Sequence, residues 1–340
     1  MATGIRRVTL KDISAACGYS VNTVSLALRD DPKLPEATRG KIKEVASSLG
    51  YIPNSSASRL RSGKTNRIAL IVDDIQNLYY TAHIAELEDL LRIKGYTVMI
   101  LCTHSQLELE RQMLLYAVSN GVDGIILAPV SNRPGSSAFF RQLGVPLILM
   151  DREVPQREHD LVCVDDYKGG RFAGRIMAEA GHRSFLYISG PSSNNSHVLR
   201  KKGLRDELEE SLGGGYKLRV ISRKKDQTSL KCDWVEPLLF PVDYTAVIAF
   251  NDDMAYQTRL TLRAAGCADR VSVIGFDHLR SSFPYLPPLS SIACASDCSI
   301  TKTALDLLMN RMEHPDAPVK TIRLPVELYE KEATAFAVNS

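Results

Sequence analysis

The sequence predicts a small all-α unit followed by a larger α/β unit with two subdomains built on doubly wound parallel sheets. Apolar residues recur at helical spacing through the first ~50 residues, and from Arg67 onward apolar strands alternate with amphipathic helices. A polar, basic stretch lies between these two regions. We therefore expect an all-α unit at residues 1–53, a hinge at 54–66 and a body at 67–340.

The first predicted helix begins after Thr9, which suits an N-cap and has Asp12 three places on, as in a capping box. Gly18 is placed to end this helix in a tight turn. Its expected buried face consists of Leu10, Ile13 and Cys17. A second helix begins at Ser20, so the two short helices and their turn have the geometry of a helix-turn-helix.

The second and third predicted helices each have an apolar face. In the second, Asn22 and Ser25 are expected to face outward. Its expected inward residues are Val21, Val24, Ala27 and Leu28. The third helix follows Pro35-Glu36 and ends at Gly50. Its expected core residues are Ile42, Val45, Ala46 and Leu49.

Basic residues are concentrated at the N-terminus. The first 64 residues hold 11 lysines and arginines against 5 aspartates and glutamates, a difference of +6, and the whole chain has a net charge of +3. The remaining residues therefore carry −3. A basic unit attached to a slightly acidic body favours phosphate contacts at one end only, although a merely solvated basic segment has the same composition.

Several runs in the first unit occur in the order typical of one family. They are Val8–Ile13, Ala16–Ser20, Thr23–Ser25, Thr38-Arg39 and Leu49–Asn54. This part of the chain resembles the lac repressor (LacI/GalR-type) family, and the likeness continues through nearly the whole body. The resemblance implies a periplasmic-binding-protein-like body, a homodimer, a near-palindromic double-stranded DNA operator, a small sugar-like effector and a place in the bacterial cytoplasm at the nucleoid.

The resemblance also assigns DNA-contact positions. Val21 and Asn22 correspond to base-reading residues, whereas Leu26 stands where many members have Arg and Arg29 where Asn is usual. Apolar Leu26 can offer a thymine methyl only a van der Waals contact, so the operator sequence is less transferable than its geometry. Hydroxyl groups are implied to contact phosphates, with capping or solvation as the alternative. The full set is Thr9, Ser20, Val21, Asn22, Thr23, Ser25, Leu26, Arg29, Tyr51, Asn54, Ala57 and Leu60.

The hinge is polar, small and basic, but Ala57 and Leu60 share an i, i+3 face. By resemblance it forms a short helix whose Leu60 wedges into the minor groove and bends the duplex. Gly63-Lys64-Thr65 resembles the end of a phosphate-binding loop. Because Ser58 stands where that motif needs its first glycine, we reject a P-loop.

The body is predicted to bind a ligand where its strands end. Nine strands are expected, with helices between them, for instance near residues 82–94, 108–119, 168–180 and 252–265. The strands are Ile68–Val72, Val98–Leu101, Gly124–Ala128, Pro146–Met150, Leu161–Val164, Phe185–Ser189, Leu218–Ile221, Ala246–Phe250 and Ser272–Gly275. Ligands of such sheets bind beyond the carboxyl ends of the strands, here in a cleft between subdomains.

Polar residues follow five of these strands: Asp73, Asp151, Asp165, Asn251 and Asp277. Each alone is more often a helix cap than a ligand contact. By resemblance, carried by Val122–Ile126, Asp151-Arg152, Gly190-Pro191, Asn251–Ala255 and Gly275–Asp277, the effector set is Tyr79, Tyr80, Asp151, Arg200, Gln227, Asn251 and Asp277. Cys294 stands where some sugar-binding members have Gln, and Gln227 where some have a stacking aromatic.

Three further interpretations concern side chains near this set. Asn195 and His197 share a loop with Arg200 and are possible additional contacts. Arg171 and Arg175 are expected to be solvated charges on a helix face. The seven cysteines lack a CxxC pair and are expected to be reduced thiols.

The sequence therefore predicts a transcription regulator, a repressor, whose operator affinity is controlled by a sugar-like effector. A regulator responding to a purine or another metabolite is the alternative, and a sugar receptor without DNA binding is a more distant one. An enzyme is not expected, because GxSxG, GxGxxG and HExxH motifs are absent. We expect no metal, no cofactor and no membrane span.

Overall fold

The computed structural model describes residues 7–52, 64–130, 136–154, 158–190, 195–222 and 239–330. The chain divides into two compact units, Met1–Thr65 and Asn66–Ser340, and each is described by itself. Four of the predicted site residues lie outside the described residues: Asn54, Ala57, Leu60 and Gln227. Within the described ranges, no helix is long and apolar enough to cross a membrane.

The described residues of the first unit form the three predicted helices: α1 (Leu10–Cys17), α2 (Val21–Ala27) and α3 (Glu36–Ser48). The capping box is confirmed, because the Thr9 N–H donates to Asp12 Oδ2 at 2.8 Å and the Asp12 N–H donates to Thr9 Oγ1 at 3.4 Å. Gly18 ends α1 with a φ of 74°, in the left-handed region that glycine adopts without strain.

The core of this small unit lies where the three helices meet, and its fully or nearly fully buried residues are Ile13, Val24, Ala27, Ile42 and Ala46. The inward placement of Val21 is wrong, since this side chain is 40% exposed. Leu49 is 38% exposed because α3 ends at Ser48. The outward placement of Ser25 is also wrong, since Ser25 is buried.

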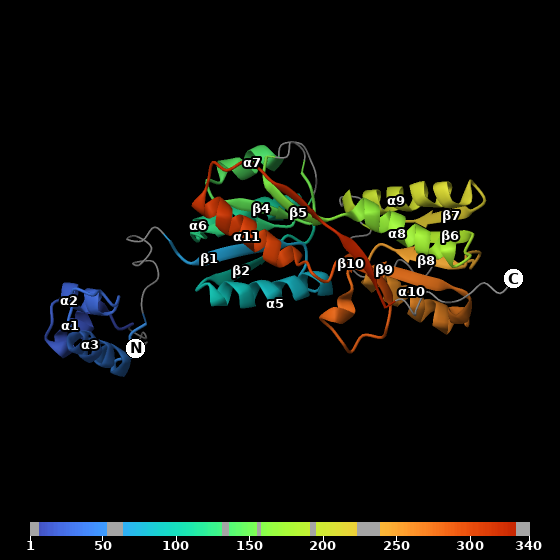
Figure 1. The fold of residues 1–340 in the computed structure, drawn as a ribbon. Coiled ribbons are helices and arrows are strands. Elements are labelled where there is room, and N and C mark those ends of the chain that lie inside the picture. The colour runs from blue at the N-terminus through green and yellow to red at the C-terminus, as the bar shows by residue number, and fades with distance from the viewer. Residues whose placement is uncertain are drawn as a thin grey trace. The chain divides into compact units, whose positions relative to one another are not determined.

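The body contains two six-stranded sheets (Figure 1). The first has the order β11-β5-β4-β3-β1-β2 and is parallel throughout. Its strands are β1 (Arg67–Val72), β2 (Thr97–Cys102), β3 (Gly124–Leu127), β4 (Leu147–Met150), β5 (Asp160–Val164) and β11 (Thr321–Leu324). The second has the order β12-β10-β9-β8-β6-β7. Its strands are β6 (Ser184–Ile188), β7 (Lys217–Ile221), β8 (Ala246–Ala249), β9 (Ser272–Phe276), β10 (Ser290–Cys294) and β12 (Val326–Tyr329).

Helices cover both faces of each sheet, so the predicted doubly wound architecture is confirmed. In β1, Ile68 and Leu70 pack on one side, beneath α5 (Leu78–Ile93) and α11 (Ile300–Glu313). Ala69 and Ile71 pack on the other, beneath α6 (Leu107–Ser119) and α7 (Ser136–Gln142). On the second sheet, α8 (Asp166–Glu179) and α9 (Asn195–Leu212) cover one face and α10 (Asp252–Ala264) the other (Figure 1).

Three strands were not predicted: β10, β11 and β12. β11 and β12 lie at the outer edge of their sheets and are separated by a single residue, Pro325. Edge strands with half-exposed charged residues lack the continuous apolar run of a central strand. β12 pairs antiparallel with β10, which makes the second sheet mixed rather than parallel.

The chain passes between the two sheets at three places in the described part. It leaves the first sheet after Val164, returns between Cys294 and Ile300, and leaves again between Leu324 and Val326. All three connections lie against the cavities described below.

Candidate functional site

Two adjoining cavities lie between residues of the two sheets. The smaller has a volume of about 60 Å³ and the larger about 510 Å³. Both are lined by Tyr79, Val164, Asp166, Arg200 and Asp277. The smaller cavity brings together every predicted effector residue that the structure describes, namely Tyr79, Tyr80, Asp151, Arg200, Asn251 and Asp277.

Two of these residues follow strand ends in an unusual backbone conformation. Asp151 follows β4 with a φ of 67°, and Asp277 follows β9 with a φ of 100°. Non-glycine residues seldom adopt positive φ, and such strain concentrates at functional sites. Asn251 follows β8 and caps α10, where its Oδ1 accepts from the Met254 N–H at 3.1 Å. The cap occupies Oδ1 and leaves the amide nitrogen of Asn251 available.

The start of α5 places two tyrosines in the smaller cavity. The Tyr79 hydroxyl donates to Asp151 Oδ1 at 2.6 Å. The other carboxylate oxygen of Asp151 is buried and has no hydrogen-bond partner in the described part of the chain. Tyr80 is buried, and its hydroxyl accepts from Arg152 Nη2 at 3.4 Å.

An ion pair that sequence reasoning missed lies beneath Tyr80. Arg152 Nη1 and Nη2 donate to the two carboxylate oxygens of Asp73 at 3.1 and 2.5 Å, and Nη1 also donates to the Pro129 carbonyl at 3.0 Å. This bidentate pair joins the ends of β1 and β4. The sequence places both residues near strand ends, but it does not show that they pair, because they are 79 positions apart.

Arg200 is buried at the centre of the site and its guanidinium is held by protein groups. Nε donates to Asp166 Oδ1 at 2.7 Å, and Nη1 donates to the Phe250 carbonyl at 2.5 Å. Asp277 Oδ1 lies 3.9 Å from Nη2. The guanidinium carbon also lies 4.2 Å from the ring centre of Phe276, a cation–π contact. Asp166, which the sequence did not single out, is therefore the closest carboxylate partner of Arg200.

Close packing of α8 and α9 sets the position of Arg200. A Cβ atom on Gly170 would lie 2.0 Å from the Arg200 carbonyl oxygen, and one on Gly203 would lie 2.1 Å from the Tyr167 carbonyl oxygen. Only glycine permits such an approach. The crossing is reinforced by buried Glu207, which bonds Arg171 Nε at 2.7 Å and Arg175 Nε at 2.9 Å. The expectation that Arg171 and Arg175 are merely solvated charges is therefore wrong.

Burial raises the pKa of both strand-end carboxyl groups. The pKa of Asp151 is about 6, because desolvation outweighs the hydrogen bond from Tyr79 and the charges of Arg152 and Arg200. The pKa of Asp277 is about 7, because desolvation outweighs the attraction of Arg200. These groups therefore exchange protons near neutral pH.

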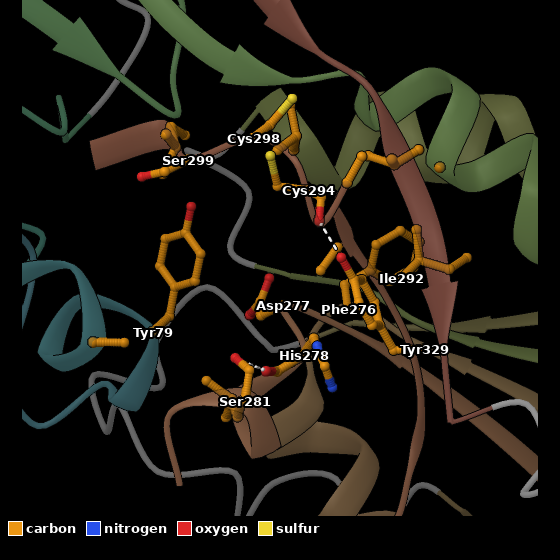
Figure 2. Close-up of a pocket in the computed structure, with 18 of the residues that line it drawn as sticks. Tyr79, Phe276, Asp277, His278, Ser281, Ile292, Cys294, Cys298, Ser299 and Tyr329 are labelled. Atoms are coloured by element: carbon orange, nitrogen blue, oxygen red, sulfur yellow. Dashed lines mark hydrogen bonds between the residues drawn. The ribbon is translucent and has the colours of Figure 1, made fainter. Parts of the chain in front are cut away.

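The larger cavity has a mostly apolar and aromatic wall (Figure 2). Figure 2 shows Tyr79 and Asp277 facing it, together with Phe276, Ile292 and Tyr329. The Tyr329 ring stacks on His278 at 3.9 Å between ring centres, and its hydroxyl donates to the Cys294 carbonyl at 2.8 Å. Cys294 and Cys298 also line this wall, and both are free thiols (Figure 2).

Asn195 and His197, considered as additional contacts in a loop with Arg200, do not line either cavity, and the loop assignment is wrong because all three residues belong to α9. His197 is buried, and its carbonyl accepts from the Tyr187 hydroxyl at 3.1 Å. Ser196, between Asn195 and His197, lines the smaller cavity instead. The first turn of α9 therefore reaches the site, but through a residue that the sequence reasoning did not name.

In the first unit, the N-terminal end of α2 is the exposed part of the predicted DNA-contact set. Ser20, Val21 and Asn22 are exposed. Ser20 Oγ caps α2 by accepting from the Thr23 N–H at 3.1 Å, and the two hydroxyls bond each other at 2.8 Å. Capping leaves room for a further bond, since each hydroxyl has two acceptor sites.

The remaining predicted DNA contacts in the described part of the chain are partly or fully buried, or already make hydrogen bonds within the unit. Ser25 is buried and Leu26 is half-buried. Arg29 is exposed, but its Nε donates to the Ser25 carbonyl at 2.8 Å. Tyr51 packs against the core of the unit. The Thr9 hydroxyl already makes the hydrogen bonds of the capping box with Asp12.

Known proteins share both parts of this chain. Residues 9–54 match the family model described as bacterial regulatory proteins, lacI family, and residues 68–288 match the model described as periplasmic binding protein domain. The regulator DegA of Bacillus subtilis is 28% identical over 292 residues, 84% of this chain and 86% of the relative. The sucrose operon repressor of Lactococcus lactis is 27% identical over 324 residues, 95% and 98% of the two chains.

A solved structure extends the likeness to the fold. The Lac repressor dimer bound to operator and the anti-inducer ONPF matches with a TM-score of 0.79 and 21% identity. The match covers 97% of this chain and 100% of that chain. The predicted combination of a helix-turn-helix unit with a two-subdomain α/β body is confirmed by this fold.

Proposed function

The chain belongs to the lacI family of bacterial regulatory proteins, and from this we propose that it is a repressor controlled by a small effector. It binds near-palindromic double-stranded DNA as a homodimer through its N-terminal unit, and the effector binds the cleft of the body. The observation that carries the proposal is a complete helix-turn-helix unit joined to a body with a ligand-sized cavity.

DNA binding is supported by exposure and charge. Asn22 and Val21 lie exposed at the start of α2, where the helix-turn-helix geometry presents side chains to base edges. The excess of +6 over the first 64 residues supplies sequence-independent attraction to phosphates. Ser20 and Thr23 then orient the helix through phosphate contacts without specifying sequence.

A sugar-like effector is supported by the separation of polar and aromatic side chains within the site. Carboxylate and amide groups at one end can each accept or donate bonds to hydroxyl groups, while aromatic side chains pack against a ring. The larger cavity, at about 510 Å³, lies within the ~300–1,000 Å³ of small-molecule pockets. One relative is named a sucrose operon repressor, which supports the carbohydrate class.

Allosteric control follows from where the cavities lie. Asp151 ends a strand of the first sheet and Asp277 a strand of the second, so a bound effector contacts both subdomains. The three connecting segments beside the cavities are positioned to bend as the subdomains move. An effector with different affinity for the two arrangements changes the DNA affinity of the dimer.

DNA selection followed by fluorescence anisotropy tests the DNA part of the proposal. We expect the full chain to enrich a two-fold symmetric site, with affinity that falls steeply as salt is raised. Lys11→Gln should weaken binding to all sequences alike, whereas Asn22→Ala should change the preferred sequence. Protection of a single asymmetric half-site by a monomer would contradict the dimer.

A further inference from the structure

The charged groups in the cleft do not balance. Among the described residues that line its two cavities, the carboxyl groups are those of Glu86, Asp151, Asp166 and Asp277, and the guanidinium groups are those of Arg152 and Arg200. Two histidines also line the larger cavity, but burial lowers the pKa of His83 to about 4 and also lowers that of His278. Neither histidine therefore supplies a cation at neutral pH.

Both guanidinium groups are already engaged by protein. Arg152 is bound bidentately to Asp73, which lies outside the cavities. Arg200 donates to Asp166 and to a backbone carbonyl. The remaining nitrogen of Arg200, Nη2, lies 3.9 Å from Asp277 Oδ1. Because the carboxyl groups that line the cavities outnumber the guanidinium groups, the cleft favours a cationic ligand over a phosphate or carboxylate.

Two carboxyl groups receive no hydrogen bond from a cation among the described residues. Asp277 forms a long ion pair with Arg200, at 3.9 Å between Oδ1 and Nη2, which is beyond hydrogen-bond distance. Asp151 receives one bond from Tyr79, and its Oδ2 atom is buried with no partner in the described ranges. Both line the smaller cavity, and both are held there by backbone in the left-handed region.

The volumes of the two cavities restrict what can lie where. The smaller cavity, about 60 Å³, exceeds the ~10–15 Å³ that one water molecule needs but is small beside the larger one. It suits a small polar group of a ligand. The larger cavity, about 510 Å³, can hold a ring against Phe276 and Tyr329.

We propose that the effector carries a protonated amine, which lies in the smaller cavity against Asp151 and Asp277 while the rest of the molecule occupies the larger one. An ammonium group has three donors and no acceptor, which matches carboxylate oxygens that lack donors. This inference rests on the proposed function, in which the cleft is the effector site.

Titration of the two carboxyl groups supports this assignment. Both have raised pKa values, and the charged groups that face them are Arg152, Arg200, Asp166 and, for Asp277, Asp253. Part of the ligand-free population therefore holds a proton where the amine would lie. Binding of a cation displaces that proton, whereas binding of a neutral sugar does not require its release.

Matched ligands test the inference on the full-length protein. D-glucosamine, D-glucose and N-acetyl-D-glucosamine, with the corresponding galactose series, differ chiefly in the charge of one group. In calorimetric titration at pH 6.0, where the sugar amine is almost fully protonated and Asp277 still holds most of its proton, we expect an amine to bind at least tenfold more tightly than its neutral partners. Repeating the titration at this pH in buffers of different ionisation enthalpy should show net proton release for the amine.

Two matched variants test whether Asp277 binds the amine. Asp277→Asn keeps the side-chain shape and tolerates positive φ, and it should weaken amine binding at least tenfold. Asp165→Asn is the matched control, since Asp165 follows β5, caps α8 and lines neither cavity. Its amine affinity should stay within twofold of the wild type.

Three outcomes would overturn the inference: a neutral sugar that binds as tightly as its amine, an absence of binding by every amine of the set, or amine binding without proton release. A neutral sugar that binds and alters DNA affinity would refute the cation while leaving the proposed function intact. Failure of the proposed function would appear separately, as an absence of selective DNA binding.

Discussion

The N-terminal unit and the cleft of the body satisfy their polar groups in different ways. In the first unit, the bonds of Thr9 and Ser20 join residues three positions apart. In the cleft, Tyr79 reaches Asp151 across 72 positions and Arg152 reaches Asp73 across 79. Local bonds are fixed by secondary structure, whereas the cleft depends on both sheets being in place. Mutations should therefore cost more stability in the cleft than in the helix caps.

Loss of the Arg200 side chain should have the largest effect. Arg200→Ala leaves buried Asp166 without its cation and removes the packing against Phe276. Breaking a buried ion pair on one side costs about 3–5 kcal/mol, so urea denaturation should show a loss in this range. Arg205→Ala, at an exposed position of the same helix, is the control and should stay within about 0.5 kcal/mol of the wild type. Equal stability of the two variants would refute the bracing role of Arg200.

The second largest effect is expected in the pH dependence of stability, which should distinguish the cleft from the N-terminal unit. A carboxyl group whose pKa is raised in the folded state keeps its proton where the unfolded chain has released it. The free energy of unfolding therefore falls as pH rises from about 4 to about 7, the range set by Asp151 and Asp277. Each tenfold change in proton affinity corresponds to about 1.4 kcal/mol, so the loss is on the order of 3 kcal/mol for Asp151 and on the order of 4 kcal/mol for Asp277.

The double variant Asp151→Asn/Asp277→Asn isolates this contribution from other buried carboxyl groups. Its melting temperature should change less between pH 5 and pH 8 than that of the wild type, and at pH 8 the variant should be the more stable protein. Differential scanning calorimetry provides the measurement. If the melting temperatures of the two proteins changed equally with pH, Asp151 and Asp277 would not cause the pH dependence.

Two glycine substitutions compare the regions directly. Gly170→Ala forces a Cβ atom against the Arg200 carbonyl and should destabilise the body by about 1–3 kcal/mol. Gly40→Ala, on the exposed side of α3, has open space around it and should stabilise the first unit by about 0.5–1 kcal/mol. Separate melting transitions, followed by calorimetry, would assign each shift. Destabilisation by Gly40→Ala would mean that α3 packs more tightly than the structure shows.

The smallest expected change is at the first helix cap. Thr9→Ala removes the side-chain half of the capping box and should cost about 1 kcal/mol of helix stability. Thr9→Ser retains the hydroxyl and should restore most of it. Circular dichroism during thermal unfolding measures both variants, and identical curves for the two would show that the cap contributes nothing.

This contrast also explains how far the sequence could predict the molecule. The three helices of the first unit, the capping box and nine strands follow from local spacing. The edge strands β11 and β12 are only four residues long, and each contains a charged residue, Arg323 or Glu327, so they lack a clear apolar run. The inward placement of Val21 failed because helical spacing alone does not say how wide the buried face of a short helix is.

The site shows the same division between local and distant information. The strand-end residues Asp151, Asn251 and Asp277 could be named from the sequence, and the structure brings them to one cavity. The pairing of Arg200 with Asp166, and of Arg171 with Glu207, could not, because each depends on how closely α8 and α9 cross. Gly170 in α8 and Gly203 in α9 are consistent with close packing, but they do not show which charged side chains form ion pairs.

The central claim is that the cleft of the body controls DNA binding by the N-terminal unit. Fluorescence anisotropy of the full chain on its selected operator, with and without the ligand found by calorimetry, tests it directly. We predict that the ligand changes the operator Kd at least tenfold, and that Asp277→Asn abolishes this response while ligand-free affinity stays within about threefold of the wild type. A ligand that binds the cleft and leaves the operator Kd unchanged would contradict the account.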